Sequence, residues 1–166
     1  MEIGYSNIAC SYNELYREEQ LAKIEAVMRY FKLPITALLL DIGCGTGIAS
    51  ERFKCKKFGL DNSIPLLKLA KGLDRVGGLA ERLPFKTKAF DAVICLTAIH
   101  NFSNPLVAVE EMLRVSNQQV VSVLKRSKDY ENLCNIIRDL LWVEHEIDSD
   151  KDTIFITRFQ ISTKQP

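Results

Sequence analysis

Residues 38–50, "LLLDIGCGTGIAS", place three leucines and an acid directly before three glycines that alternate with other residues. The apolar run is typical of a strand that is buried on both faces of a parallel sheet. Gly43, Gly45 and Gly47 let the backbone turn tightly and come close to a ligand. The residues after the loop predict a helix, whose first N–H groups have no partner within the helix. This stretch therefore predicts the first strand–loop–helix unit of an α/β domain.

The same alternation continues along the chain. Apolar patterns predict strands at residues 37–42, 57–61, 75–80, 90–99 and 118–125, and helices at residues 47–54, 63–73, 104–115 and 128–141. Residues 141–147 and 153–161 form two further strands with no helix between them, so we expect this pair to be antiparallel. We therefore predict a single Rossmann-like, doubly wound α/β domain with a mostly parallel, seven-stranded sheet and an antiparallel C-terminal edge pair.

An amphipathic helix is expected ahead of the first strand. Apolar side chains recur at helical spacing within residues 13–32, Asn13 is the candidate N-cap, and Pro34 ends the pattern. We assign residues 1–166 to one domain, in which residues 1–34 form a helical cap segment and residues 35–166 form the core.

Composition excludes several classes of protein. The net charge of +1 over 166 residues indicates neither a strongly basic nor a strongly acidic partner. The five cysteines are odd in number and contain no CxxC pair, so we expect no metal site, no disulfide framework and a reducing, cytoplasmic location. No apolar run reaches the roughly 20 residues of a membrane span, and no secretory signal is recognised, so no membrane partner is expected.

Two acids suggest what the glycine loop binds. Asp41 stands two residues before Gly43, where its carboxylate would repel a diphosphate and would favour a ligand with an ammonium group. The dinucleotide pattern GxGxxG would also require a glycine where Ile48 stands. Asp61 ends the second strand, where it can accept hydrogen bonds from ribose hydroxyls in either kind of nucleotide. The loop therefore favours S-adenosylmethionine over a dinucleotide.

Four segments in order carry a family resemblance. "LLLDIGCGTG", "FGLDNSIPLLKLA", "LAERLPFKTKAFDAVICLTAIH" and "EEMLRV" resemble the motifs of class I S-adenosylmethionine-dependent methyltransferases, in particular the small type 11 methyltransferase domain, from Leu38 to Val115. Two positions depart from the family pattern. Leu79 replaces an acid that often receives the adenine amino group, and the turn in "RVSNQQVV" is shorter than usual.

The resemblance implies roles for particular residues. The methionine part of S-adenosylmethionine would be held by Asp41 and by the loop residues Gly43, Cys44, Gly45 and Gly47. Asp61 and Asn62 would bind the ribose, Ala80 and Glu81 would lie along the adenine, and Leu96 and Thr97 would flank the cofactor. Tyr12, with Tyr5 as a second candidate, would close over the methionine end.

His100 is the candidate general base, because it follows the 90–99 strand at the end that faces the expected methyl site. The alternative is a histidine that bonds the local backbone and shapes the pocket, and Asn101 carries a weaker form of the same hypothesis. Lys125, Arg126 and Lys128 either meet an anionic acceptor or belong to a solvated loop. Trp142 is assigned to the core.

The expected function is transfer of a methyl group from S-adenosylmethionine to an unidentified small-molecule, RNA or protein acceptor by in-line displacement. No Asn-Pro-Pro-Tyr or Asp-Pro-Pro-Tyr motif follows the 90–99 strand, which argues against the amino-group methyltransferases that use it. A partner subunit or a homodimer remains open. The alternatives are a cofactor-binding, non-catalytic subunit of a methyltransferase complex and an NAD(P)-binding oxidoreductase.

Overall fold

The computed structural model describes the backbone of residues 5–157 and the side chains from Arg17 onward. Its centre is a seven-stranded sheet in the order β3-β2-β1-β4-β5-β7-β6. The strands are β1 (Leu38–Ile42), β2 (Lys56–Asp61), β3 (Asp74–Gly77), β4 (Ala92–Cys95), β5 (Gln119–Leu124), β6 (Val143–Asp148) and β7 (Asp152–Thr157).

The sheet is mixed. β1 pairs in parallel with β2 and β4, β2 with β3, and β4 with β5, whereas β7 lies antiparallel between β5 and β6. The predicted fold class is therefore confirmed, including the antiparallel edge pair. The chain starts in the middle of the sheet, runs outward to β3 and returns to β4. This places a change of winding direction between β1 and β4, where α/β sheets leave a crevice beyond the carboxyl ends of the strands.

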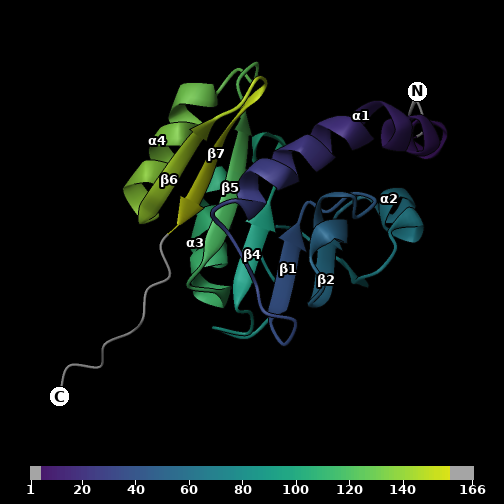
Figure 1. Cartoon of the computed structure of the whole chain (residues 1–166), viewed down its shortest axis with the longest axis horizontal. Helices are drawn as coiled ribbons and strands as arrows, with labels where there is room; N and C mark the ends of the chain where they lie inside the picture. Colours follow the sequence, from purple (N-terminus) through teal and green to yellow (C-terminus); the bar gives the residue numbers. More distant parts are fainter. Residues whose placement is uncertain (1–4, 158–166) are drawn as a thin grey trace.

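Helices cover both faces of the sheet. α1 (Tyr5–Met28) and the short 3₁₀ helix η1 (Ala49–Arg52) pack on one face, and α3 (Pro105–Val115) and α4 (Tyr130–Leu140) pack on the other. α2 (Ile64–Leu69) lies beside β2 and β3, and η2 (Ile99–Asn101) follows β4. Figure 1 shows α1 running across the ends toward which β1 and β4 point. The first helix therefore reaches the edge of the sheet where a ligand would bind.

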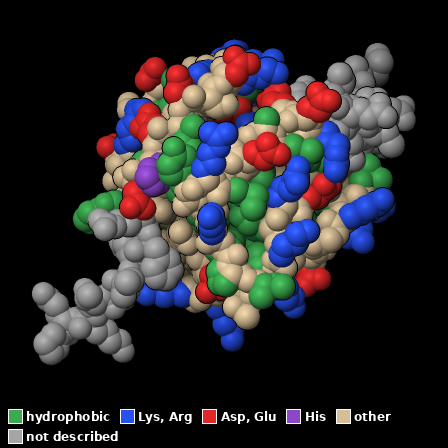
Figure 2. Space-filling view, viewed as in Figure 1, with side chains coloured by type: hydrophobic (Ala, Val, Ile, Leu, Met, Phe, Trp, Pro, Cys, Tyr) green, Lys and Arg blue, Asp and Glu red, His purple; other side chains and the backbone are tan. Residues whose placement is uncertain are grey.

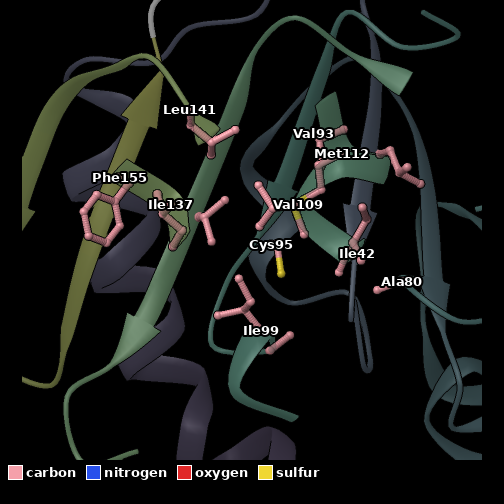
Figure 3. Packing of buried hydrophobic residues seen from close by; sticks show 14 of the residues in the cluster. Ile42, Ala80, Val93, Cys95, Ile99, Val109, Met112, Ile137, Leu141 and Phe155 are labelled. Atoms are coloured by element: carbon pink, nitrogen blue, oxygen red, sulfur yellow. The ribbon is translucent and has the colours of Figure 1, made fainter. Parts of the chain in front are cut away.

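The core follows the alternation of the strands. Ile42, Val93 and Cys95 face α3 and α4, where they join Val109, Met112 and Ile137 in one apolar cluster (Figure 3). Leu39, Ile94 and Ile154 face the opposite side, where they join Ile24, Val27 and Phe31 from α1 and the segment after it. Successive residues of one strand thus anchor opposite layers, as expected for a sheet that is buried on both faces.

Local sequence chemistry explains the start of α3. The side-chain oxygen of Asn104 accepts a hydrogen bond from the N–H of Val107 at 3.3 Å, and Pro105 occupies the first helical position. This N-cap and proline arrangement satisfies one N–H that the helix itself leaves unpaired. Asn104 is therefore the N-cap of α3.

Several predicted boundaries were wrong. α1 begins well before Asn13, which lies inside the helix and is not its cap. The expected 47–54 helix is only the four residues of η1, and the expected 90–99 strand ends at Cys95. Thr97 has a φ of 56°, a left-handed conformation that a strand cannot contain, and this turns the chain into η2. Trp142 is 64% exposed and does not belong to the core.

The surface carries no dominant charge on the face that Figure 2 shows, because lysine and arginine side chains are interspersed with aspartate and glutamate. Among residues 5–157, no helix has the length and hydropathy needed to cross a membrane. The mixture of charges on this face agrees with the net charge of +1.

Replacement of Phe31 by alanine tests the attachment of the α1 side of the domain. Phe31 is fully buried and meets the ring of Phe53 edge-on, with the ring centroids 6.0 Å apart. We expect Phe31→Ala to lower the free energy of unfolding by about 3–5 kcal/mol in urea titrations, since a large core side chain is lost. The neighbouring Tyr30→Ala, at a side chain that is 54% exposed, should cost much less. Equal losses for the two variants would contradict this packing.

Candidate active site

A pocket of about 720 Å³ lies beyond the carboxyl ends of β1, β2 and β4. Its volume is within the range that is usual for sites that bind small molecules. The residues predicted from sequence that line it are Gly43, Gly45, Asp61, Asn62, Ala80, Glu81 and Thr97. Sequence reasoning did not assign Ser63, Leu66, Gly78, Phe102 and Ser103 to the site, and they line it too. Their residue types carry no chemical pattern by which they could have been recognised.

A second, smaller pocket of about 20 Å³ adjoins the first at Gly43, which lines both. The predicted residues Asp41, Cys44 and Leu96 line it, together with Gln20 from α1. Gly47 lines neither pocket. The side chains of Tyr12 and Tyr5 lie outside the described residues, so their predicted closure over the methionine end stays a prediction.

The glycine loop needs glycine at Gly43 for two separate reasons. Its φ is +68°, which side-chain-bearing residues rarely adopt, and a β-carbon built there would lie 2.4 Å from the β-carbon of Ala98. The loop is held in place by the N–H of Gly43, which donates to the carbonyl of Leu60 at 2.8 Å. The loop thus packs directly against the chain after β4, and the two together form the floor of the larger pocket.

Asp61 connects the loop to the start of α2. One carboxylate oxygen accepts a hydrogen bond from the N–H of Gly45 at 2.7 Å, and the other accepts from the N–H of Ser63 at 2.8 Å. The residue is 8% exposed and lines the larger pocket. A carboxylate oxygen can accept more than one hydrogen bond, so both oxygens keep capacity for ligand hydroxyls. Sequence reasoning found the residue but not this second, organising role.

Asp41 is a buried carboxyl group with an unused oxygen. It is 1% exposed, and its Oδ2 has no hydrogen-bond partner among the described residues. Burial raises its pKa to about 7, and the nearby Asp61 carboxylate adds to this, while the Ser50 hydroxyl and Lys57 oppose it. A buried acceptor without a partner is costly, which fits a site that receives N–H donors from a ligand.

The segment of residues 78–90, of which Gly78, Leu79, Ala80 and Glu81 form a wall of the larger pocket, is held by α3. Glu111 accepts a hydrogen bond from the N–H of Leu83 at 2.7 Å, and Arg114 donates to the carbonyls of Leu83 and Phe85 at 3.1 and 2.7 Å. Glu111 and Arg114 also pair with each other at 2.6 Å. The motif "EEMLRV" therefore supplies the clamp for this wall.

Glu81 has a structural partner at the start of α3. Its Oε1 accepts a hydrogen bond from the N–H of Asn104 at 3.1 Å, which connects the pocket wall to the helix. The predicted contact between Glu81 and adenine must therefore share this carboxylate with the helix start. Leu79, which stands where the family often has an acid, is 55% exposed at the pocket and offers only apolar surface.

A buried polar network under α1 was not predicted. Lys23 forms an ion pair with Asp152 on β7 at 2.7 Å, and their side chains are only 2% and 0% exposed. Lys23 also donates to the hydroxyl of Thr97, and that hydroxyl donates to Asp152 at 3.3 Å. The N–H of Thr97 donates to Ser122 at 2.8 Å. The network fixes α1 and the strained Thr97 relative to each other at the rim of the pocket.

His100 lies in η2 and is not among the residues that line either pocket, although its neighbour Asn101 lines the larger one. Burial lowers the pKa of its imidazole, so the ring is neutral near pH 7, and its Nδ1 has no partner among the described residues. The general-base hypothesis stays a prediction.

The basic loop after β5 is only partly available to an acceptor. Lys125 pairs with Asp148 at 2.6 Å and donates to the carbonyl of Ser149, so it is bound to the β6–β7 turn. Arg126 and Lys128 are exposed.

Burial raises the pKa of the Cys44 and Cys95 thiols, which are therefore poor nucleophiles. No cluster of three potential metal ligands occurs among residues 17–157, whose side chains the structure describes.

Comparison with known proteins decides the family. The profile of the methyltransferase domain, type 11, matches residues 40–123, which include the glycine loop, Asp61 and the α3 clamp. The chain belongs to this family of S-adenosylmethionine-dependent methyltransferases. The predicted resemblance is confirmed.

Curated relatives share parts of the domain. An uncharacterised protein of Methanocaldococcus jannaschii is 32% identical over 132 residues, which cover 76% of this chain and 51% of that protein. Demethylmenaquinone methyltransferase of Renibacterium salmoninarum is 36% identical over 85 residues, which cover 47% of this chain and 36% of that enzyme. The methyltransferase domain described here thus spans about half or less of the length of these relatives.

Solved structures share the fold. A chain of the complex between the Trm112 methyltransferase activator of Haloferax volcanii and a methyltransferase has a TM-score of 0.76 at 15% identity, with 95% of this chain and 99% of that chain covered. A SAM-dependent methyltransferase of Aquifex aeolicus has a TM-score of 0.74 at 17% identity, with 93% and 98% covered. At these identities the likeness concerns the fold alone.

Substitution of Gly43 separates its two constraints in the methyltransferase domain. Gly43→Ala adds left-handed strain, about 1–2 kcal/mol, and an overlap with Ala98, about 1–3 kcal/mol. Gly72→Ala is the matched control, because Gly72 has a φ of +71° and no atom within 4 Å of the added β-carbon. In urea unfolding, Gly43→Ala should therefore cost more than Gly72→Ala. Adding Ala98→Gly to Gly43→Ala should restore only the part of the lost stability by which Gly43→Ala exceeds Gly72→Ala. No restoration would argue against the close approach of Gly43 and Ala98.

The buried Asp41 predicts an unusual pH dependence of stability. Its folded pKa, about 7, lies above the ordinary value of 3.8, so the folded state binds more protons between these values. The stabilising effect of this proton is complete below about pH 4 and is lost as the pH rises to 7. Asp41→Asn should therefore gain stability relative to the wild type between pH 5 and 7.5 in urea titrations. Asp139→Asn, at an exposed residue of α4, should run parallel to the wild type.

Proposed function

We propose that this domain binds S-adenosylmethionine in the larger pocket, with the methionine end toward Asp41, and transfers its methyl group to an acceptor by in-line displacement. The observation that carries the proposal is the unpartnered, buried Oδ2 of Asp41 beside the glycine loop. An acceptor oxygen at that position suits an ammonium group and repels a diphosphate. This favours S-adenosylmethionine over NAD(P).

The residues of the chain would bind and orient the cofactor. Asp61 would accept hydrogen bonds from the ribose hydroxyls, and its hydrogen bonds with Gly45 and Ser63 support this by fixing the carboxylate. The wall that Glu111 and Arg114 clamp would lie along the adenine. The bound sulfonium group supplies an activated methyl, so the main task of the protein is to align the acceptor atom with it. Asn101 and Phe102, which line the pocket, are candidates for contact with the acceptor.

Incubation with radiolabelled S-adenosylmethionine and whole cell extract, which is fractionated after the reaction, tests the activity. We expect label to enter one fraction, which identifies the acceptor as RNA, protein or small molecule. Whole extract is used because one structural neighbour was solved with an activator subunit, and the extract supplies such a partner if this chain requires one. Binding of S-adenosylhomocysteine without label in any fraction would favour the non-catalytic subunit. Preference for NADH over S-adenosylhomocysteine in calorimetry would reject the proposal.

Asp61→Ala tests the ribose contact. We expect the binding of S-adenosylhomocysteine to weaken by about 1.5–3 kcal/mol in calorimetry, because charged hydrogen bonds to the ribose hydroxyls are lost. Since Asp61 also holds the glycine loop, the 2′-deoxy analogue of the ligand is the control. The deoxy ligand should bind the wild type less well than the parent ligand, and the variant should lose this preference. An unchanged preference in the variant would show that Asp61 acts only through the loop.

A further inference from the structure

We propose that Gln20 on α1 is a cofactor-binding residue, whose side-chain oxygen joins Oδ2 of Asp41 in holding the ammonium group of the methionine part of S-adenosylmethionine. The inference rests on the proposed function and extends it, because it makes α1 part of the cofactor site. No motif at Gln20 predicted this role.

The smaller pocket has the size and polarity for one ammonium group. Its volume of about 20 Å³ suits a single water-sized group. Ile48, Ala49 and Leu96 give it apolar walls, and its other lining residues besides Gly43 are Gln20 from α1, Asp41 from β1, Cys44 and Thr46. Gly43 lines both pockets, so a group that extends from a ligand in the larger pocket reaches the smaller one over this glycine.

Gln20 and Asp41 each leave one acceptor unused. Gln20 is 7% exposed and Asp41 is 1% exposed, and Oε1 of the first and Oδ2 of the second have no hydrogen-bond partner among the described residues. A buried acceptor without a donor is destabilising, and two of them at one small pocket make a place for a group that only donates. An ammonium group carries three N–H donors and no acceptor, and its charge complements the Asp41 carboxylate.

The orientation of the Gln20 amide follows from its other end. Nε2 donates to the hydroxyl of Thr97 at 3.4 Å. That hydroxyl has one proton, which it donates to Asp152, and it accepts from Lys23 as well. Because a hydroxyl has two lone pairs, Gln20 must present an N–H to Thr97. The amide oxygen then remains for the smaller pocket.

The ion pair of Lys23 with Asp152 positions Gln20. Lys23 stands three residues after Gln20 in α1, so both side chains lie on one face of the helix. The pair is buried at 2.7 Å and fixes this face against β7 and the rim after β4. Gln20 is thus held at the pocket before any ligand binds, and the bound ammonium group would connect α1 to the end of β1.

Binding measurements with two ligands test the proposal. S-adenosylhomocysteine carries the ammonium group, and its desamino analogue has hydrogen there. In calorimetry, the wild type should bind S-adenosylhomocysteine about tenfold or more tightly than the analogue. Gln20→Met keeps the length of the side chain and removes the acceptor, so it should reduce this preference severalfold, mainly by weakening S-adenosylhomocysteine. Glu18→Met, at an exposed position of the same helix, should keep the wild-type preference.

The binding measurements distinguish failure of the role of Gln20 from failure of the proposed function. Equal binding of the two ligands by the wild type, or equal weakening of both by Gln20→Met, would overturn the role of Gln20. Failure of the wild type to bind S-adenosylhomocysteine at all would instead overturn the proposed function. If Gln20→Met does not fold, amide hydrogen exchange of the wild type tests whether α1 contacts the ammonium group. S-adenosylhomocysteine should slow exchange in α1 more than the desamino analogue does at equal saturation, and equal protection would overturn the proposal.

Discussion

The site depends on the two hydrogen bonds that Asp61 accepts from the backbone. One reaches the glycine loop after β1, and the other reaches the turn before α2, so a single carboxylate at the end of β2 sets the distance between the two segments. Charged hydrogen bonds of this kind are stronger than neutral ones. The loop itself cannot move toward β4, because Gly43 already touches Ala98. The floor of the pocket is therefore fixed from both sides before a ligand enters.

Several residues around this floor have unfavourable environments or backbone conformations. Asp41 is buried with an unused oxygen, Thr97 holds a left-handed backbone, and Lys23 is taken out of water with Asp152. Each of these features lowers stability unless its surroundings compensate, and such features concentrate at functional sites. The two apolar clusters on the faces of the sheet supply that compensation. Asp41 and Thr97 stand at the carboxyl ends of β1 and β4, and Asp152 begins the antiparallel β7 opposite the end of β5.

The sequence predicted what depends on short spacing. The glycine loop and the acids at Asp41 and Asp61 are local patterns with one physical explanation each, and the structure brings them together at the two pockets. Periodicity also predicted the α/β fold class with a mostly parallel sheet, because continuous apolar strands alternate with helices. The network of Lys23, Thr97 and Asp152 could not be predicted, since it joins residues far apart that look like ordinary surface residues. Trp142 was misassigned because residue type alone does not reveal which side of a strand end faces water.

The ion pair between Lys23 and Asp152 joins the first helix to the last described strand. A nascent chain emerges from the ribosome with its N-terminus first, so Lys23 has only Glu19 of its own helix, at 3.9 Å, as a counterion until β7 has been synthesised. Until then, burial of the lysine is unfavourable, and the ion pairs that connect α1 to the domain are the exposed ones of Arg17 with Glu51 and of Glu25 with Arg52. The order of translation thus makes the formation of β7 the step that completes the buried polar network at the rim of the pocket.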